Sequence, residues 1–526
     1  MKNVYLFLIM FLFAGQLYGQ RFLESTFETE VTRNQFYGAN FTAITIPVTG
    51  SSTLQPLVMD VYEPAGDTAD ERPLIIYVHT GNFLPIIVNG GISGTKSDSA
   101  TVEICTRLAE LGYVVASIDY RLGWNPFGAT QPDRAFSLIN AAYRGVQDVR
   151  TAVRYFRRDF TENNNQWGID QERITVFGQG TGGYLSLTGA VLDEYLEIPQ
   201  TMNPPGKFLT DLDGNPMTLE PMIIEAWNGD IFGTSLGIAP TGDTLCVPNH
   251  VGYSSDFDLS INLGGAMADI SWMEAGDVPI ISFHAPQDQF APYYDDILRV
   301  GTNNDPVVQV QGSHYVAEMG NALGNNDVFD QVVTDEWTEA AMDASAKAGH
   351  QYYEALFPFN RPINVFGNFE SAPWEWWNPS VFDTIPHPFV PGATIHQVQL
   401  TFNAMQSRAQ AERYIDTIIN YIAPRAFIAL DLDNWSGVQE QITAQDVSLK
   451  IGPNPATDVV NFSSDIESPI TRIVIFDATG KTVKQIDDLR VNDYQLQLNE
   501  FSAGNYYVGI SFDRGLVVEP LTILRN

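Results

Sequence analysis

Short, strongly apolar runs at intervals along the chain are the feature that most constrains its fold. Four of them, residues 73–80, 113–120, 174–180 and 278–285, are rich in β-branched side chains and have few polar interruptions. Strands with this composition are typical of parallel sheets, in which helices cover both faces and leave no strand face exposed to water. The four runs therefore predict buried strands.

Amphipathic segments lie between these runs. Residues 101–112 carry apolar side chains at helical spacing and stop at Gly112, a residue suited to the position just after a helix. Residues 138–159 repeat the pattern, and residues 410–426 predict a closing helix that ends before Pro424. Strand alternating with helix predicts the α/β class, with a doubly wound, mostly parallel sheet.

The N-terminus has the pattern of an export signal. Lys2 precedes an apolar run over residues 4–13, and small and polar residues follow up to Gly19. The run is short for a bilayer span, so residues 1–19 are predicted to be a cleaved signal peptide, and no later segment reaches membrane length. Export would permit a disulfide between Cys105 and Cys246, although two buried thiols fit equally well.

Charge excludes whole classes of partner. The 526-residue chain has 63 acidic and 28 basic residues, which gives a formal charge of −35. Nucleic acids and anionic membranes would repel such a surface, so neither is expected as a partner. No nucleotide-binding motif and no histidine pair at metal-ligand spacing is present, so we expect neither cofactor nor metal.

The composition and the hydrophobic pattern of the chain change near its C-terminus. A polar stretch over residues 434–446 separates the α/β region, residues 20–433, from short alternating strands over residues 447–526. Those strands predict a small all-β sandwich. The chain is therefore expected to hold a signal peptide, an α/β domain, a linker and a β domain.

Two stretches interrupt the α/β alternation. Residues 195–255 and 336–400 are rich in Pro, Gly, Asn and aromatic residues and predict insertions into the α/β domain. The second contains Trp374, Trp376 and Trp377. Such a cluster either stacks on a sugar or an aromatic ligand or forms the packed core of an inserted subdomain.

The β domain resembles a known export module. Residues 451–462, 473–483 and 501–510 resemble, in order, the three blocks of the type IX secretion C-terminal sorting domain, type A. The resemblance implies that residues 447–526 engage the type IX secretion machinery and direct passage across an outer membrane. The cargo would then be released or linked to surface lipopolysaccharide.

Residues 57–288 resemble the carboxylesterase and hormone-sensitive-lipase-like branches of the α/β-hydrolase superfamily. The resemblance rests on stretches such as "PLIIYVHTGNF", "LGYVVASIDYRLG", "WGIDQERITVFGQGTGG" and "VPIISFHAPQDQFAPY". It implies an α/β-hydrolase fold with insertions and a site built, in chain order, from an oxyanion loop, a nucleophile elbow, an acid and a histidine.

The elbow departs from its pattern at the residue that should attack. The G-x-S-x-G frame is occupied here by residues 178–182, and Gly180 stands in place of serine. Thr181, one position later, corresponds to the residue whose amide serves the oxyanion hole. Its hydroxyl is a less favoured candidate nucleophile, because it should leave the turn in another direction.

The oxyanion loop is altered as well, whereas the acid is kept. The family pattern H-G-G-G-[FW] is matched at its ends by His79 and Phe83, while two glycines are replaced and Gly81 remains beside Asn82. His79, Gly81 and Asn82 are the candidate oxyanion residues. Asp288 corresponds to the acid, and His284 before it is expected to be structural.

The general base has two candidates in the sequence. His350 lies in a segment similar to the family's G-x-G-H motif, and His314 follows an apolar run that leads into a helix. We rank His350 slightly ahead of His314. His387 and His396 lie in the inserted region and are less favoured.

These departures give three hypotheses. The leading one is an exported protein of esterase lineage that lacks the standard mechanism and binds a small ester or carbohydrate-ester ligand. The alternative is an active extracellular ester hydrolase with a displaced hydroxyl or an activated water as nucleophile. A purely structural surface module is the third, and it predicts no pocket near Trp374.

Overall fold

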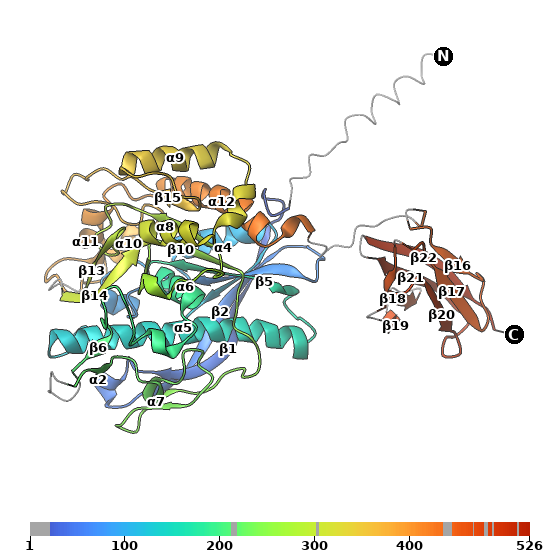
Figure 1. The fold of residues 1–526 in the computed structure, drawn as a ribbon, viewed down its shortest axis with the longest axis horizontal. Helices are drawn as coiled ribbons and strands as arrows, with labels where there is room; N and C mark the ends of the chain where they lie inside the picture. The colour runs from blue at the N-terminus through green and yellow to red at the C-terminus, as the bar shows by residue number, and fades with distance from the viewer. Residues whose placement is uncertain are drawn as a thin grey trace, which may run out of the picture. The chain divides into compact units, whose positions relative to one another are not determined.

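The computed structural model describes residues 21–525, except residues 212–217, 301–304, 435–443, 446, 467, 478–481, 487–488 and 513–514. The chain forms two compact units, which divide between Asp433 and Asn434 (Figure 1). The predicted signal peptide and most of the predicted linker lie outside the described residues.

An eight-stranded sheet organises the first unit, in the order β1-β2-β4-β3-β5-β10-β12-β15. Only β1 with β2 and β2 with β4 pair antiparallel, so the sheet is mostly parallel. The four predicted strands are confirmed as β3, β4, β5 and β12. The bounds are β1 (Thr29–Thr42), β2 (Thr53–Pro64), β3 (Arg72–Val78), β4 (Val114–Ile118), β5 (Ile169–Gln179), β10 (Leu259–Leu263), β12 (Ile280–His284) and β15 (Leu356–Pro358).

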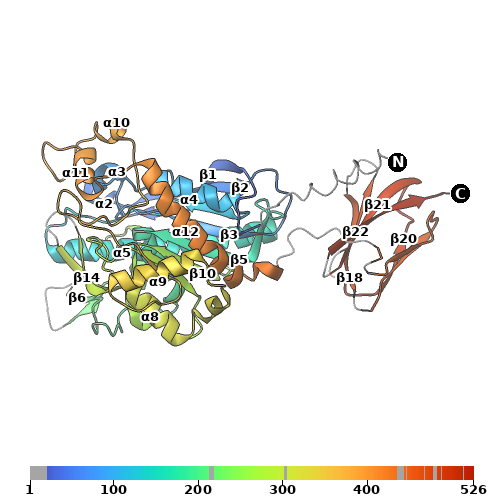
Figure 2. The same ribbon diagram turned by 90° about the horizontal axis from the view of Figure 1, so that it is seen from above.

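Helices cover both faces of this sheet, as the view from above shows (Figure 2). Helix α4 contacts α12 on one face, and α5 contacts α6 on the other. The predicted doubly wound α/β fold is therefore confirmed. The main helices are α4 (Ser99–Glu110), α5 (Gln131–Glu162), α6 (Thr181–Val191), α8 (Ser313–Leu323), α9 (Glu336–Ala348) and α12 (Arg408–Ala429).

Helix α12 corrects one expectation, because it continues through Pro424 to Ala429. Proline removes one amide donor from a helix, and neighbouring contacts can hold the remaining turns. Here the next residue, Arg425, is fully buried, lies 3.5 Å from the centre of the Tyr421 ring and pairs with Glu354 at 2.6 Å. These contacts anchor the turn that the proline weakens.

Short elements connect the main strands and helices, and only some of them fall within the two predicted inserted stretches, residues 195–255 and 336–400. Outside those stretches, strands β13 and β14 pair antiparallel and join β11 in a small second sheet. The short elements are α2 (Ile46–Thr49), α3 (Ile86–Asn89), η1 (Tyr195–Glu197), β6 (Leu209–Thr210), β7 (Glu220–Pro221), α7 (Glu225–Asn228), β8 (Gly237–Ile238), β9 (Thr244–Cys246), β11 (Ala266–Met267), η2 (Ile270–Trp272), β13 (Asp295–Val300), β14 (Asp305–Gly312), η3 (Asp327–Gln331), α10 (Pro379–Phe382), α11 (Ile395–Phe402) and η4 (Leu432–Asn434).

The core of the first unit contains an ion pair as well as apolar side chains. Residues of β3, β4 and β5 pack against the buried side of α5. At the end of β4, Arg121 donates from its Nε to Asp148 on α5 at 2.8 Å, and both side chains are 0% exposed. Cys105 and Cys246 are both buried and unpaired.

The second unit consists of two antiparallel sheets, which confirms the predicted all-β domain. One has the order β16-β17-β20 and the other β19-β18-β21-β22. Both contribute to one apolar core, with Phe462 from the first sheet and Ile475 and Val508 from the second. The strands are β16 (Lys450–Gly452), β17 (Val459–Ser463), β18 (Ile470–Asp477), β19 (Thr482–Ile486), β20 (Asp493–Gln497), β21 (Gly504–Phe512) and β22 (Gly515–Ile523).

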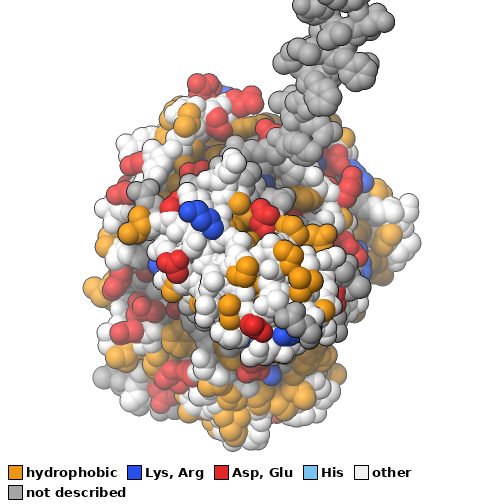
Figure 3. Space-filling view, turned by 90° about the vertical axis from the view of Figure 1, so that its right-hand side faces the viewer, with side chains coloured by type: hydrophobic (Ala, Val, Ile, Leu, Met, Phe, Trp, Pro, Cys, Tyr) orange, Lys and Arg blue, Asp and Glu red, His pale blue; other side chains and the backbone are white. Residues whose placement is uncertain are grey.

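On the face drawn in Figure 3, acidic side chains (red) are scattered among apolar, basic and uncharged ones. Within the part of the chain that the structure describes, no helix has the length and apolar character needed to cross a membrane.

Candidate ligand-binding site

The strand-to-helix turn after β5 has the geometry of a nucleophile elbow. Gly180 lies between β5 and α6 with φ 54° and ψ −115°, a conformation that side chains disfavour. Its neighbours are crowded too, because a Cβ at Gly178 would lie 2.0 Å from the Gly182 carbonyl oxygen. The glycines are therefore what allows β5 to turn so sharply into α6.

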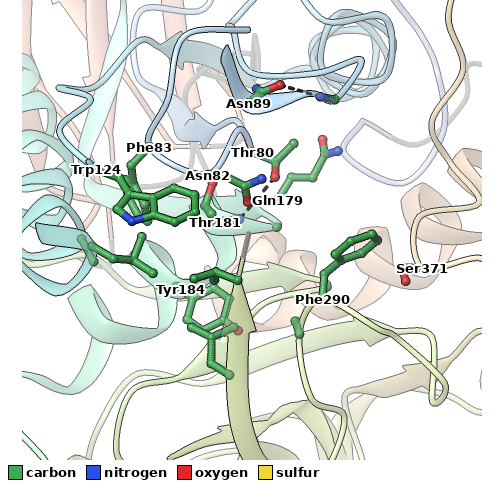
Figure 4. A pocket seen from close by; sticks show the side chains of 18 of the residues that line it. Thr80, Asn82, Phe83, Asn89, Trp124, Gln179, Thr181, Tyr184, Phe290 and Ser371 are labelled. Atoms are coloured by element: carbon green, nitrogen blue, oxygen red, sulfur yellow. Dashed lines mark hydrogen bonds between the residues drawn. The ribbon is translucent and has the colours of Figure 1, made fainter. Parts of the chain in front are cut away.

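Thr80 occupies the space in which a nucleophile side chain would begin. A Cβ built on Gly180 would lie 2.2 Å from Thr80 Oγ1 and 2.8 Å from Thr80 Cβ. The same hydroxyl accepts a hydrogen bond from the Thr181 amide at 3.4 Å (Figure 4). Thr80 thus fills the nucleophile position and covers the amide that would serve an oxyanion hole.

The loop after β3 keeps a glycine-like backbone despite its substitutions. Gly81, Asn82 and Phe83 all have positive φ, at 133°, 57° and 55°. A Cβ at Gly81 would lie 2.6 Å from Gly94 Cα, so that glycine is required by close packing. Asparagine tolerates positive φ better than most residues do, which explains its presence here.

His79 binds this loop through its ring, and it does not line the cavity that lies at this end of the sheet. Its Nδ1 contacts the Thr80 carbonyl oxygen at 2.5 Å, and its Nε2 lies 3.4 Å from Asp119 Oδ1. Burial lowers the pKa of His79, but the hydrogen bond and charge of Asp119 outweigh burial and raise it overall. Of the three candidate oxyanion residues, only Asn82 faces the cavity.

Thr181 begins α6 and faces the cavity. Its hydroxyl lies 3.2 Å from the Tyr120 hydroxyl, which itself donates to the His79 carbonyl oxygen at 3.0 Å. The side chain is therefore held at the start of the helix by Tyr120. Its hydroxyl contact is to a phenol rather than to a base.

Asp288 follows β12 and also lines the cavity. Its Oδ1 accepts hydrogen bonds from the amides of Phe290 at 2.6 Å and Ala291 at 3.1 Å, and its Oδ2 lies 3.5 Å from His284 Nε2. His284 is fully buried and contacts Ser313 Oγ at 2.7 Å through Nδ1. The carboxylate is thus fixed by its own turn.

The two predicted bases lie together but away from the cavity. The His314 and His350 rings are 4.6 Å apart, and His350 Nε2 contacts the Tyr293 hydroxyl at 2.8 Å. Neither ring lines the cavity. Burial, and then the nearby His350, lower the pKa of His314.

A different histidine, His387, reaches the cavity from the inserted region. Its Nδ1 accepts hydrogen bonds from the amides of Phe389 at 3.2 Å and Val390 at 3.1 Å. Burial lowers its pKa, although a hydrogen bond to the Gly90 backbone opposes that shift. His387 therefore fixes the inserted segment beside Gly90. His396 instead accepts from Trp377 Nε1 at 3.0 Å.

The cavity has a volume of about 620 Å³, within the usual range for small-molecule sites. It adjoins the carboxyl ends of β3, β5 and β12, where open α/β sheets bind ligands. Gly180, Asp288 and His387 face the same space. The remaining wall is largely apolar, and Figure 4 labels Phe83, Trp124, Tyr184 and Phe290 on it. Its aromatic residues are Phe83, Trp124, Tyr143, Tyr184, Phe208, Trp272, Phe290, Trp374, Trp377, Phe389 and Phe402.

Glu375 is a cavity residue that the sequence pattern did not reveal. Burial, opposed by hydrogen bonds with Ser93 and Gln179, raises its pKa to about 7. Gln179, the variable residue that precedes Gly180 in the elbow, donates to its carboxylate at 2.8 Å. The signal available in the sequence was a lone acid inside the tryptophan cluster. Among the described residues, no group of three side chains is placed to hold a metal ion.

Comparison with protein families matches both units. Residues 59–210 match the BD-FAE family, and residues 450–523 match the family described as "Secretion system C-terminal sorting domain". The first match covers the oxyanion loop and the elbow, and the second covers nearly all of the β unit.

Two curated proteins match part of the chain. Non-reducing polyketide synthase pkbA of Emericella nidulans is 27% identical over 34% of this chain, and non-reducing polyketide synthase atr1 of Stereocaulon alpinum is 30% identical over 26%. The chain spans only 6% and 5% of their lengths.

Similar solved structures include esterase 2 of Thermogutta terrifontis. The form phosphorylated by paraoxon is 16% identical, covers 63% of this chain and 82% of its own, and has a TM-score of 0.29. The propionate-bound form is also 16% identical, covers 64% and 85%, and has a TM-score of 0.28.

The fold and both family matches define an esterase-like α/β-hydrolase that carries an export module. Residues 59–210 match the first of these families, and residues 450–523 match the C-terminal sorting domain of the type IX secretion system. It is therefore a type IX secretion cargo that reaches the cell surface or the medium.

Proposed function

We propose that this protein is an exported pseudoenzyme of esterase lineage. It binds a ligand in the cavity beside Gly180, which corresponds to the substrate pocket of an esterase, and it does not hydrolyse esters. The observation that carries the proposal is the pairing of Gly180 with Thr80. The elbow has no nucleophile, and a Cβ at Gly180 would lie 2.2 Å from Thr80 Oγ1.

Energetics favour loss of the standard mechanism. Removal of the nucleophile from a serine hydrolase costs about 10⁴ to 10⁶ in rate. The Thr80 hydroxyl also accepts from the Thr181 amide, so an oxyanion would have to displace it. Both losses fall at the same point of the site, and no single substitution corrects the two together.

The cavity supports a binding role over a purely structural one. It is open, its wall is largely apolar, and Trp374 lines it, where a structural module would have no pocket. A small ester or carbohydrate ester fits the esterase lineage of the domain. Export would begin with a signal peptide over residues 1–19 and finish through the type IX machinery.

Esterase assays on the exported full chain test the proposal. We expect no turnover of p-nitrophenyl acetate or butyrate by the native protein. Gly180→Ser alone should also be inactive and less stable, because its side chain meets Thr80. Thr80→Gly combined with Gly180→Ser should recover the stability, which serves as the folding control. If the native protein turns over either ester and Asp288→Ala abolishes that turnover, the pseudoenzyme hypothesis is wrong.

One observation favours the alternative of an active hydrolase. The Thr80 hydroxyl lies 2.2 Å from the place where a Cβ of residue 180 would be, and Thr80 lines the cavity. Thr80→Val keeps the side-chain shape and removes that hydroxyl. Native turnover that disappears in Thr80→Val would identify Thr80 as a displaced nucleophile.

A further inference from the structure

We propose that the cavity binds an organic ammonium ligand with an apolar body, and that Glu375 is the carboxylate that pairs with its positive charge. The inference rests on the proposed binding function and narrows its ligand from esters in general to a molecule that carries an ammonium group. It follows from three features: an oriented hydrogen-bond chain, the lack of a counter-ion, and an apolar wall that includes aromatic residues.

Two successive hydrogen bonds between buried side chains orient an amide N–H donor toward the Glu375 carboxylate. The Tyr77 hydroxyl donates to Gln179 Oε1 at 2.6 Å, which fixes the amide so that its Nε2 donates to Glu375 Oε1 at 2.8 Å. Tyr77 and Gln179 are 0% and 2% exposed, and the Thr101 hydroxyl bonds Tyr77 from behind. Donors pointed at a carboxyl group favour its ionised form.

No protein cation completes this arrangement. Among the described residues, the side chain of Glu375 bonds Gln179 and Ser93, and the charge that acts on it, Asp98, is also negative. Glu375 is partly exposed toward the cavity, and a carboxylate that loses much of its hydration without gaining a counter-ion is disfavoured in an apolar site. Burial accordingly raises the pKa of Glu375 to about 7, and a bound cation would remove that cost.

The rest of the cavity suits a cation with an apolar body. Aromatic faces attract ammonium groups, and eleven of the residues that line the cavity are aromatic, while aliphatic side chains supply further apolar surface. The charged residues on that wall are two acids, Glu375 and Asp288, and one base, Arg299. An anionic ligand would meet net repulsion there, whereas a neutral one would leave Glu375 unpaired.

Three probes with the same phenyl body test the charge requirement. We would titrate the full chain at pH 8 with 2-phenylethylammonium, 2-phenylethanol and 3-phenylpropanoate in a calorimeter. We expect the ammonium to bind at least about tenfold more tightly than the alcohol, and the carboxylate to bind most weakly. Glu375→Gln should abolish the preference for ammonium over alcohol.

Matched variants separate charge from folding. Glu375→Asp keeps the charge and should keep the ammonium preference. Glu339→Gln removes an exposed carboxylate from α9 and should bind as the native protein does. A thermal melt of each variant identifies any that fail to fold, and Glu375→Asp then decides the question.

Equal affinity for ammonium and alcohol, binding of none of the probes, or an unchanged preference in Glu375→Gln would overturn the ammonium inference. The first and last of these outcomes leave the cavity as a binding site. The proposed function would fail in a different experiment. It is overturned by ester turnover by the native protein, which the order of probe affinities does not measure.

Discussion

At the scale of single residues, two contacts define the site: Thr80 with Gly180, and Gln179 with Glu375. The side chain absent at Gly180 is matched by the one added at Thr80, which fills the same space. The elbow residue Gln179 donates a hydrogen bond to the Glu375 carboxylate. The turn that presents a nucleophile in esterases therefore now presents an amide to a carboxylate.

The raised pKa of Glu375 predicts how its replacement changes stability with pH. The folded protein holds the proton up to about pH 7, whereas the unfolded chain releases it near the ordinary value of 4.5, so ionisation penalises folding increasingly between these pH values. Gln179, Ser93 and Asp98 are the groups that act on it there. Glu375→Gln removes the penalty.

Thermal melts measure this effect. Glu375→Gln should be more stable than the native protein by about 1–3 kcal/mol at pH 8, with little difference near pH 4.5. The exposed replacement Glu339→Gln should show no such trend. A Glu375→Gln variant that is less stable than the native protein at pH 8 would contradict the assignment.

At the scale of elements, charged side chains join the strands to the helices that cover them. Arg121, just after β4, binds Asp148 on α5 through both its Nε and its backbone amide, each at 2.8 Å. Its guanidinium also donates to Gln147 Oε1 at 3.0 Å. This pair fixes the middle of α5 against the sheet.

Breaking this pair should be costly, because it leaves a buried charge without its partner. Asp148→Asn should lower the free energy of unfolding by about 3–5 kcal/mol. The control lies on the same helix, where the Arg158–Glu162 pair has both side chains 45% exposed. Glu162→Gln should cost less than about 1 kcal/mol, and chemical denaturation compares the two variants. Equal costs would refute the special role of the buried pair.

The apolar runs predicted the strands well because burial on both faces leaves little choice of residue. Helix ends were less predictable, as Pro424 shows. Its effect on α12 depends on Arg425 and Glu354, a pairing between positions 71 residues apart. A contact of that kind has no local sequence signal.

At the scale of the whole molecule, the chain is divided into two units with separate cores. Val460, Ile473 and Val508 belong to a core within the second unit, which is the one matched by the sorting-domain family. The binding cavity lies wholly within the first unit. Export and ligand binding are therefore expected to be separable.

Removal of residues 447–526 tests that separation in a bacterium with type IX secretion. We expect the truncated protein to accumulate in the periplasm, while the full chain reaches the cell surface or the medium. Fractionation followed by immunoblotting measures the distribution. Truncated protein in the medium at the level of the full chain would show that other residues direct export.

The sequence by itself determined the strands, the glycine elbow, the sorting domain and the missing serine, because each depends on local composition or on an ordered motif. Tertiary structure alone decided that Thr80 fills the place of the nucleophile, that His314 and His350 lie away from the cavity, and that Glu375 faces Gln179. Residues 80 and 180 are distant in the chain, and residues 179 and 375 are more so. Only the folded sheet, which brings the ends of β3 and β5 together beneath the inserted loop, places them in contact.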